Sequence, residues 1–195
     1  MAAVSFRQLN ADDLDSFVAY LAPHMDENGR GNTALFYPQL RSVPWPVTDK
    51  APRFLTSWAK SLHEPGWSRA WGAFGEAGKV VGHADIRARP EPCTNHRALL
   101  GLGVDSKFRN QGIAKHLMQI VLDWAKAQES IVWLDQHLLG GNARARARAV
   151  YEHLGFHELV SVPDMFRIDG QSVADVAMTK RIRVTAELAT IASIP

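Results

Sequence analysis

The sequence predicts a mixed α/β fold, in which one sheet is flanked by helices. Short runs rich in apolar and β-branched residues alternate with stretches whose apolar residues recur at the helical period. The expected order is one strand, two helices, three strands, a helix, a strand, a helix and two strands. That order, in 195 residues of which 46% are hydrophobic, indicates one domain with a full core and no internal repeat.

Each element is placed by its apolar spacing and by the residues that start or stop it. The first helix, for example, is expected to end at Pro23, because proline lacks a backbone N–H. Asp49 is expected to cap the second helix. The expected strands are 4–9, 69–75, 79–87, 98–104, 130–136, 156–162 and 173–180, and the expected helices are 12–22, 49–63, 113–128 and 143–154.

Composition argues against several classes of protein. The formal net charge is only +2, which does not favour nucleic-acid binding. The single cysteine, Cys93, excludes an internal disulfide, and no CxxC pair or His/Cys cluster has metal-ligand spacing. The start of the chain does not resemble a signal peptide, and no apolar run reaches the ~20 residues that span a bilayer. We therefore expect a cytoplasmic protein that uses no metal and binds neither membrane nor nucleic acid.

The stretch from Val104 to His116 organises the second half of the chain. An apolar run, Ala98–Val104, is expected to form a buried strand, and a long helical pattern follows the turn. Gly112 in that turn lets the backbone approach a phosphate, because no Cβ stands in the way. The first N–H groups of a helix lack intrahelical partners, and the helix dipole adds positive potential there. This order predicts an anion site, to which Arg109 and Lys115 add charge.

Two motifs then resemble a known family. Arg109, Gly112 and Ala114 form an Arg-x-x-Gly-x-Ala pattern, which resembles the acyl-CoA-binding motif of the GCN5-related N-acetyltransferases (GNAT). About forty residues later, Arg148–Phe156 is similar to the family's second motif, Ala-Arg-x-x-Tyr-x-x-x-Gly-Phe. The resemblance implies a GNAT-like fold for residues 1–183, with a mostly antiparallel mixed sheet of about seven strands and about four helices. Residues 184–195 would form a C-terminal tail.

The resemblance implies acetyl-CoA as the acyl donor. Backbone N–H groups of the turn would hold its pyrophosphate, and the preceding strand would hold its pantetheine arm where two strands splay apart. A backbone N–H aimed at the acyl carbonyl would stabilise the oxyanion that forms on attack. The residues implied as cofactor-binding are Leu102, Gly103, Val104, Arg109, Asn110, Gln111, Gly112, Ile113, Ala114, Lys115, Asn142 and Tyr151.

Three features of these motifs leave alternatives open. Gly101 and Gly103 share a strand face, and they either leave room for the ligand or pack against a helix. Family members often carry an asparagine seven residues before the tyrosine, and this chain has Arg144 there. Asn142 lies nine residues before Tyr151, so it reaches the usual position only if the added Ala-Arg pair is absorbed in the turn. The arginine run is interpreted as a solvated face, since RNA binding would need more interleaved aromatic residues.

The second motif also implies a general acid. An amine that attacks a thioester displaces sulfur, and a positioned phenol can protonate that sulfur. Tyr151 stands where the family's acid usually stands, four residues before Gly155. The general base is less defined, because Ala98 occupies the position at which some members carry glutamate. The candidates are His83, Asp85 and His96, acting directly or through water.

A long irregular segment over 24–47 separates the first two helices. Segments of this length within a compact domain are usually functional or disordered. The resemblance implies that it lines the acceptor pocket, whereas the alternative is a surface loop that packs its own aromatic residues. Asp26, Glu27 and Tyr37 are the candidate substrate-binding residues.

The sequence thus predicts an N-acetyltransferase that moves an acetyl group from acetyl-CoA to a primary amine of a small molecule or a peptide. Direct attack in a ternary complex is expected, because Cys93 has no obvious histidine partner for a covalent route. The alternative is a catalytically silent acyl-CoA-binding or regulatory module of the same fold. Homodimers are common among proteins of this kind, so the resemblance also admits a homodimer.

Overall fold

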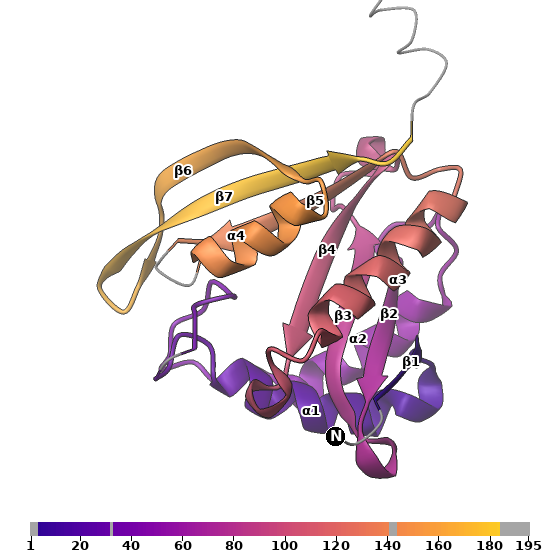
Figure 1. Cartoon of the computed structure of the whole chain (residues 1–195), viewed down its shortest axis with the longest axis horizontal. Helices are drawn as coiled ribbons and strands as arrows, with labels where there is room; N and C mark the ends of the chain where they lie inside the picture. Colours follow the sequence, from indigo (N-terminus) through magenta and orange to yellow (C-terminus); the bar gives the residue numbers. More distant parts are fainter. Residues whose placement is uncertain (1–3, 32, 141–143, 184–195) are drawn as a thin grey trace, which may run out of the picture.

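The computed structural model describes residues 4–31, 33–140 and 144–183, which form one seven-stranded sheet in the order β1-β2-β3-β4-β5-β7-β6 (Figure 1). Neighbouring strands are antiparallel except for β4 and β5, which are parallel. The expected mixed, mostly antiparallel sheet with four helices is confirmed. The strands are β1 (Ser5–Gln8), β2 (Ser68–Phe74), β3 (Val80–Ala88), β4 (Arg97–Val104), β5 (Trp133–Leu139), β6 (His157–Ile168) and β7 (Gln171–Arg181), and the helices are α1 (Leu14–Asp26), α2 (Val47–Ala59), α3 (Ile113–Ala127) and α4 (Arg144–His153).

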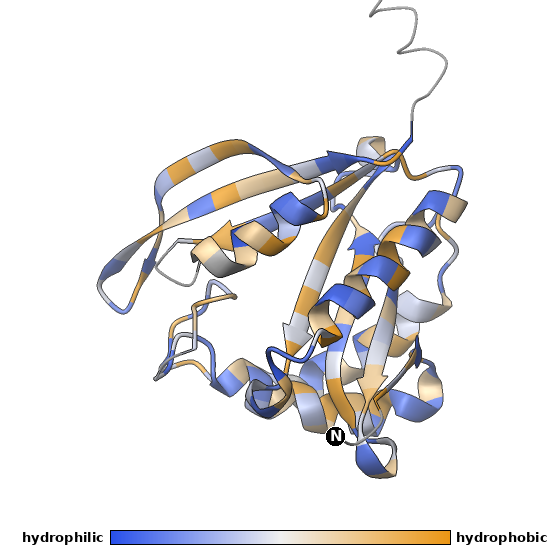
Figure 2. Cartoon of the chain, viewed as in Figure 1, coloured by the Kyte–Doolittle hydropathy of each residue, from blue (hydrophilic) through white to orange (hydrophobic). Residues whose placement is uncertain are grey.

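Helices cover both faces of the half of the sheet that contains β1 to β4. On one face α3 buries an apolar stripe against β2, β3 and β4, while its hydrophilic residues lie on the outward side (Figure 2). On the other face α1 and α2 pack a second core against β2 and β3. Alternate residues of a strand point to opposite faces, so odd-numbered residues of β3 from His83 onward face α1.

Several element ends differ from the sequence expectation. Helix α1 does not end at Pro23 but continues to Asp26. The missing N–H of proline removes one hydrogen bond, but His24, one residue further on, is buried against the sheet and packing outweighs that loss. Helix α2 follows Pro46 rather than Asp49 and ends at Ala59, which is earlier than expected. Strands β6 and β7 are longer than expected, because they pair with each other around the turn at Asp169 and Gly170.

Strands β4 and β5 pair over only part of their length. Three residue pairs join them, ending at Leu99 and Asp135, and beyond these the strands separate (Figure 1). We call the paired part the closed half, and the part of β4 from Leu100 to Val104 with the part of β5 from Gln136 to Leu139 the open half. No helix among the described residues is long and apolar enough to cross a membrane.

Candidate active site

The turn after β4 has the conformation that an anion site needs. Gly112 has φ +80° and caps α3, and a Cβ placed on it would meet no atom within 4 Å. The side chain of Asp105 accepts a hydrogen bond from the Lys107 N–H and orders the start of the turn. The first N–H groups of α3 have no acceptor within the helix, so the backbone here is open to a ligand.

Arg109 turns back from this site towards α1. Its Nε donates to the Val104 carbonyl at 2.9 Å, and its Nη2 lies 2.9 Å from Oε2 of Glu27. The hydroxyl of Ser106 donates to the other carboxylate oxygen of Glu27 at 2.7 Å. Glu27, which the sequence assigned to the acceptor side, therefore joins the end of α1 to the turn after β4. The charge of Arg109 is shared with Glu27.

The glycines of β4 make room for side chains of this chain. A Cβ on Gly101 would lie 2.0 Å from Oδ2 of Asp85, and a Cβ on Gly103 would lie 2.6 Å from Nε2 of His24. Packing against a helix is thus what the structure shows for Gly103. The Oδ1 atom of Asp85 lies 2.5 Å from Nη1 of Arg87. The side chains of His83 and Asp85 are only 12% and 22% exposed, so this row is not a solvated face.

Two aromatic residues of α1 complete this cluster. The hydroxyl of Tyr20 lies 3.0 Å from Nδ1 of His83, and the ring of His24 stacks between Tyr20 and Phe36. Burial, with smaller contributions from His83 and Arg109, lowers the pKa of His24 to about 3. Burial also lowers the pKa of His83, although Asp85 opposes the shift. Sequence reasoning missed Tyr20 and His24, whose spacing of four on an apolar helix face was the available signal.

Tyr151 lies on α4 with only 3% of its surface exposed and packs edge-on against Phe156. Its hydroxyl makes no hydrogen bond with any residue that the structure describes. Burial raises the pKa of the Tyr151 phenol, Asp85 raises it further, and Arg87 lowers it. The phenol of Tyr151 therefore senses the charges of the Asp85–Arg87 pair, which lies where β4 and β5 separate. The phenol stays protonated at neutral pH.

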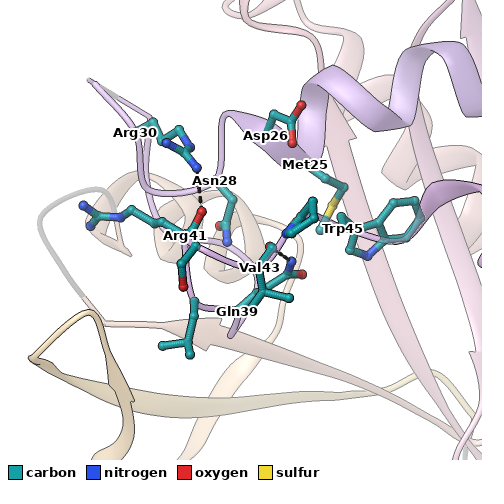
Figure 3. A pocket seen from close by; sticks show the side chains of 11 residues that line it. Met25, Asp26, Asn28, Arg30, Gln39, Arg41, Val43 and Trp45 are labelled. Carbon is teal, nitrogen blue, oxygen red and sulfur yellow. Dashed lines mark hydrogen bonds between the residues drawn. The ribbon is translucent and has the colours of Figure 1, made fainter.

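The segment between α1 and α2 is held in place by Asn28. Its Oδ1 accepts hydrogen bonds from the backbone N–H groups of Phe36 and Tyr37. Tyr37 contributes to the electrostatic environment of Arg87, so it also lies near the point of separation. Asp26 is exposed and lines a cavity of about 190 Å³ formed by the segment itself (Figure 3).

The structure does not bring the candidate base His96 into this cluster. His96 is exposed and precedes β4 at the closed half, and its carbonyl accepts the N–H groups of Val132 and Trp133. Five residues of strand separate His96 from Gly101, which corresponds to ~16 Å. Asn142 lies outside the described residues.

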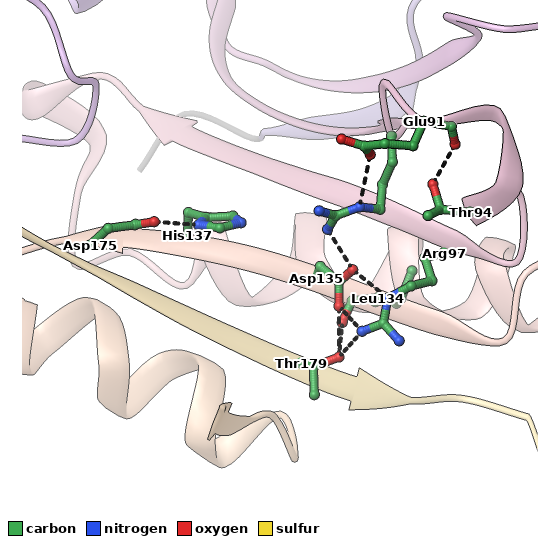
Figure 4. A network of polar contacts seen from close by, with 9 residues as sticks. Glu91, Thr94, Arg97, Leu134, Asp135, His137, Asp175 and Thr179 are labelled. Atoms are coloured by element: carbon green, nitrogen blue, oxygen red, sulfur yellow. Dashed lines mark hydrogen bonds and ion pairs between the residues drawn. The ribbon is translucent and has the colours of Figure 1, made fainter. Parts of the chain in front are cut away.

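The closed half is fastened by a buried carboxylate. Asp135 accepts hydrogen bonds from Arg89 at 2.9 Å, from Arg97 at 2.5 and 2.8 Å, and from Thr179 at 2.7 Å (Figure 4). Burial alone would raise the pKa of Asp135, but the hydrogen bonds from Arg97 and Thr179 hold it below its usual range. The ionised carboxylate on β5 thus joins β4, β7 and the segment after β3 at the point from which the open half diverges.

The sequence model of the acetyltransferase (GNAT) family matches residues 34–156, which include β4, the Gly112 turn and Tyr151. The chain belongs to this family. As a GNAT member, it is 36% identical over 91 residues to N-acetyltransferase family 8 member 2 of Rattus norvegicus. That match covers 44% of this chain and 39% of the relative, so the chain spans well under half of the relative's length.

Solved structures share the GNAT fold with this chain. An N-acetyltransferase from Staphylococcus aureus Mu50 superposes with a TM-score of 0.75 at 16% identity, covering 93% of this chain and 100% of that one. A GNAT superfamily phosphinothricin acetyltransferase from Sinorhizobium meliloti, solved in complex with AcCoA, superposes with a TM-score of 0.72 at 18% identity, covering 91% and 88%. At these identities the likeness establishes the fold of this GNAT member.

Proposed function

We propose that this protein is an N-acetyltransferase that transfers the acetyl group of acetyl-CoA to a primary amine by direct attack in a ternary complex. One observation carries the proposal: β4 separates from β5 near Asp85 and Arg87, whose charges act on the buried phenol of Tyr151, and then runs into the open turn at Gly112. Family membership and the AcCoA-bound relative from Sinorhizobium meliloti support acetyl-CoA as the donor.

The described residues fit this donor. The N–H groups from Gln111 to Lys115 would face its pyrophosphate, because nothing fills the space around Gly112. In the open half, the edge of β4 that faces away from β3 runs through Leu102, Gly103 and Val104 and pairs with no described strand. Its backbone groups are therefore available to hydrogen-bond the pantetheine amide and the acyl carbonyl, as an added strand would.

Tyr151 would act as the general acid. Its phenol is protonated at neutral pH and its hydroxyl has no partner among the described residues, so the proton is available to the departing sulfur. On the acceptor side, Oδ2 of Asp85 accepts no hydrogen bond from the described residues, and a carboxylate in that position attracts an ammonium group. His83, 3.8 Å from that oxygen, would hold Asp85 in place. Tyr37 and Asp26 remain our candidates for acceptor contacts, and Glu27 would act through Arg109.

A thiol-release assay tests the function. The protein is mixed with acetyl-CoA and a panel of amines that includes a peptide N-terminus, lysine, a polyamine, an aminoglycoside and free amino acids. We expect amine-dependent release of CoA with at least one acceptor. Binding of acetyl-CoA without turnover on any amine would instead indicate the silent acyl-CoA-binding module.

A further inference from the structure

A histidine and an aspartate form a pair on β5 and β7. Nδ1 of His137 lies 2.8 Å from Oδ2 of Asp175 (Figure 4). The side chain of His137 is 45% exposed, and its Nε2 makes no hydrogen bond within the described residues. The other carboxylate oxygen of Asp175, Oδ1, is buried and has no hydrogen-bond partner there. The ring of His137 is therefore the only described hydrogen-bond partner of this largely buried carboxylate.

The register of the sheet places this pair at the open half. Strands β4 and β5 last pair at Leu99 and Asp135, and two residues further along they carry Gly101 and His137. Because alternate residues share a face, His137 points to the same face as Asp135, whose carboxylate binds Arg89 and Arg97. That is also the face of Asp85 and Arg87. His137 thus stands across the separation from Asp85.

We propose that His137 is the general base that deprotonates the acceptor amine, and that Asp175 is the residue that positions it. The assignment rests on the proposed acetyltransferase function. A carboxylate that binds Nδ1 favours the tautomer with hydrogen on Nδ1, which leaves the lone pair of Nε2 free to accept a proton. As the amine nitrogen bonds to the acyl carbon, its proton passes to Nε2. The carbon–sulfur bond then breaks, and the sulfur takes the proton of Tyr151.

His83 is less suited to this role. Its Nδ1 is occupied by Tyr20 and its side chain is largely buried, whereas Nε2 of His137 is exposed to an incoming amine. Charged and titratable groups face His137 from several elements. Asp175 faces the ring of His137 from β7. Asp135 lies on the same strand as His137, and its charge is balanced by Arg89 and Arg97. Across the separation stand the paired Asp85 and Arg87, with Tyr37 and Tyr151 near them.

The test is the pH profile of kcat/KM, measured on the best acceptor of the panel for wild type, His137→Gln and the control His63→Gln, which changes an exposed histidine distant in sequence from the site. We expect His137→Gln to lose ~10²-fold or more of kcat/KM at neutral pH and to lose the rise of kcat/KM with pH. Its acetyl-CoA affinity should match that of wild type, and His63→Gln should behave as wild type. Asp175→Asn, which favours the wrong tautomer, should lower kcat with little effect on acetyl-CoA affinity.

The outcomes separate the base from the function. An active wild type whose His137→Gln variant keeps both the rate, within about twofold, and the rise with pH would overturn the assignment of His137 alone. A wild type that turns over no amine would overturn the proposed function, and the assignment with it.

Discussion

The closed and open halves of the β4–β5 pair are built from similar polar residues but leave them in different states. In the closed half, Asp135 is satisfied by two arginines and a threonine. In the open half, the hydroxyl of Tyr151 and Nε2 of His137 have no hydrogen-bond partner within the described chain. Buried polar groups are normally paired, so the network around Asp135 stabilises the fold, whereas the buried hydroxyl of Tyr151 and the partly exposed ring of His137 are available to a ligand.

The difference arises from β7 and from the glycines of β4. In the closed half, β7 brings Thr179 beside Asp135, and β4 contributes Arg97, so the carboxylate has donors on both sides. In the open half, β4 carries Gly101 and Gly103, and their missing side chains let Asp85 and His24 approach the backbone.

The largest effect should follow from breaking the closed half. Asp135→Ala leaves Arg89 and Arg97 without their partner in a mostly buried position, and we expect the free energy of unfolding to fall by ~3–5 kcal/mol. Urea denaturation followed by circular dichroism measures it. Thr179→Val, which removes one hydrogen bond and keeps the volume, should cost less. A loss below ~1 kcal/mol for Asp135→Ala would show that the network does not hold these strands together.

A smaller effect, on rate rather than stability, is expected in the open half. Tyr151→Phe removes only the hydroxyl, so the fold and acetyl-CoA affinity should remain. If that hydroxyl protonates the leaving sulfur, kcat should fall by ~10²-fold, which is ~2.7 kcal/mol of barrier. The defect should shrink with an acyl donor whose thiol is more acidic. Turnover within about twofold of wild type, with chemistry rate-limiting, would make Tyr151 a packing residue.

The buried imidazole of His24 predicts a pH dependence of stability. Its pKa is about 3 in the folded protein and ~6.5 when unfolded, so the unfolded chain binds more protons between these values. Its contribution is complete above pH ~6.5 and is lost progressively as the pH falls towards 3, by ~2 kcal/mol at pH 5. Urea unfolding midpoints at pH 7.5 and 5, compared between wild type and His24→Phe, measure how much of the stability lost at low pH comes from His24. An equal loss in both proteins would exclude His24 as its source.

The sequence predicted the parts of the site that lie within short segments. The Gly112 turn, the strand before it and the helix that carries Tyr151 are local patterns, and all were placed correctly to within a few residues. The pairs that join distant segments were not visible. Glu27 meets Arg109 across 82 residues, and His137 meets Asp175 across 38.

These pairs depend on the order of strands in the sheet rather than on local sequence. Placing β7 between β5 and β6 puts Asp175 beside His137, and only the pairing register shows that both face the open half. Similarly, Pro23 indicated a helix end, but the burial of His24 against Tyr20 and Phe36 extends α1 beyond it. In both cases tertiary contacts decide the outcome.

The most direct test of the central claim, that the open half binds the acyl donor, is amide hydrogen exchange with and without acetyl-CoA. We predict slower exchange in residues 101–104 and 111–115 and no change in residues 97–99 and 133–135 of the closed half. Gly112→Asp, which places a carboxylate where a phosphate would lie, should weaken binding by at least ~2 kcal/mol and abolish the protection at a donor concentration that saturates wild type. Protection confined to other segments, or unchanged in Gly112→Asp, would contradict the claim.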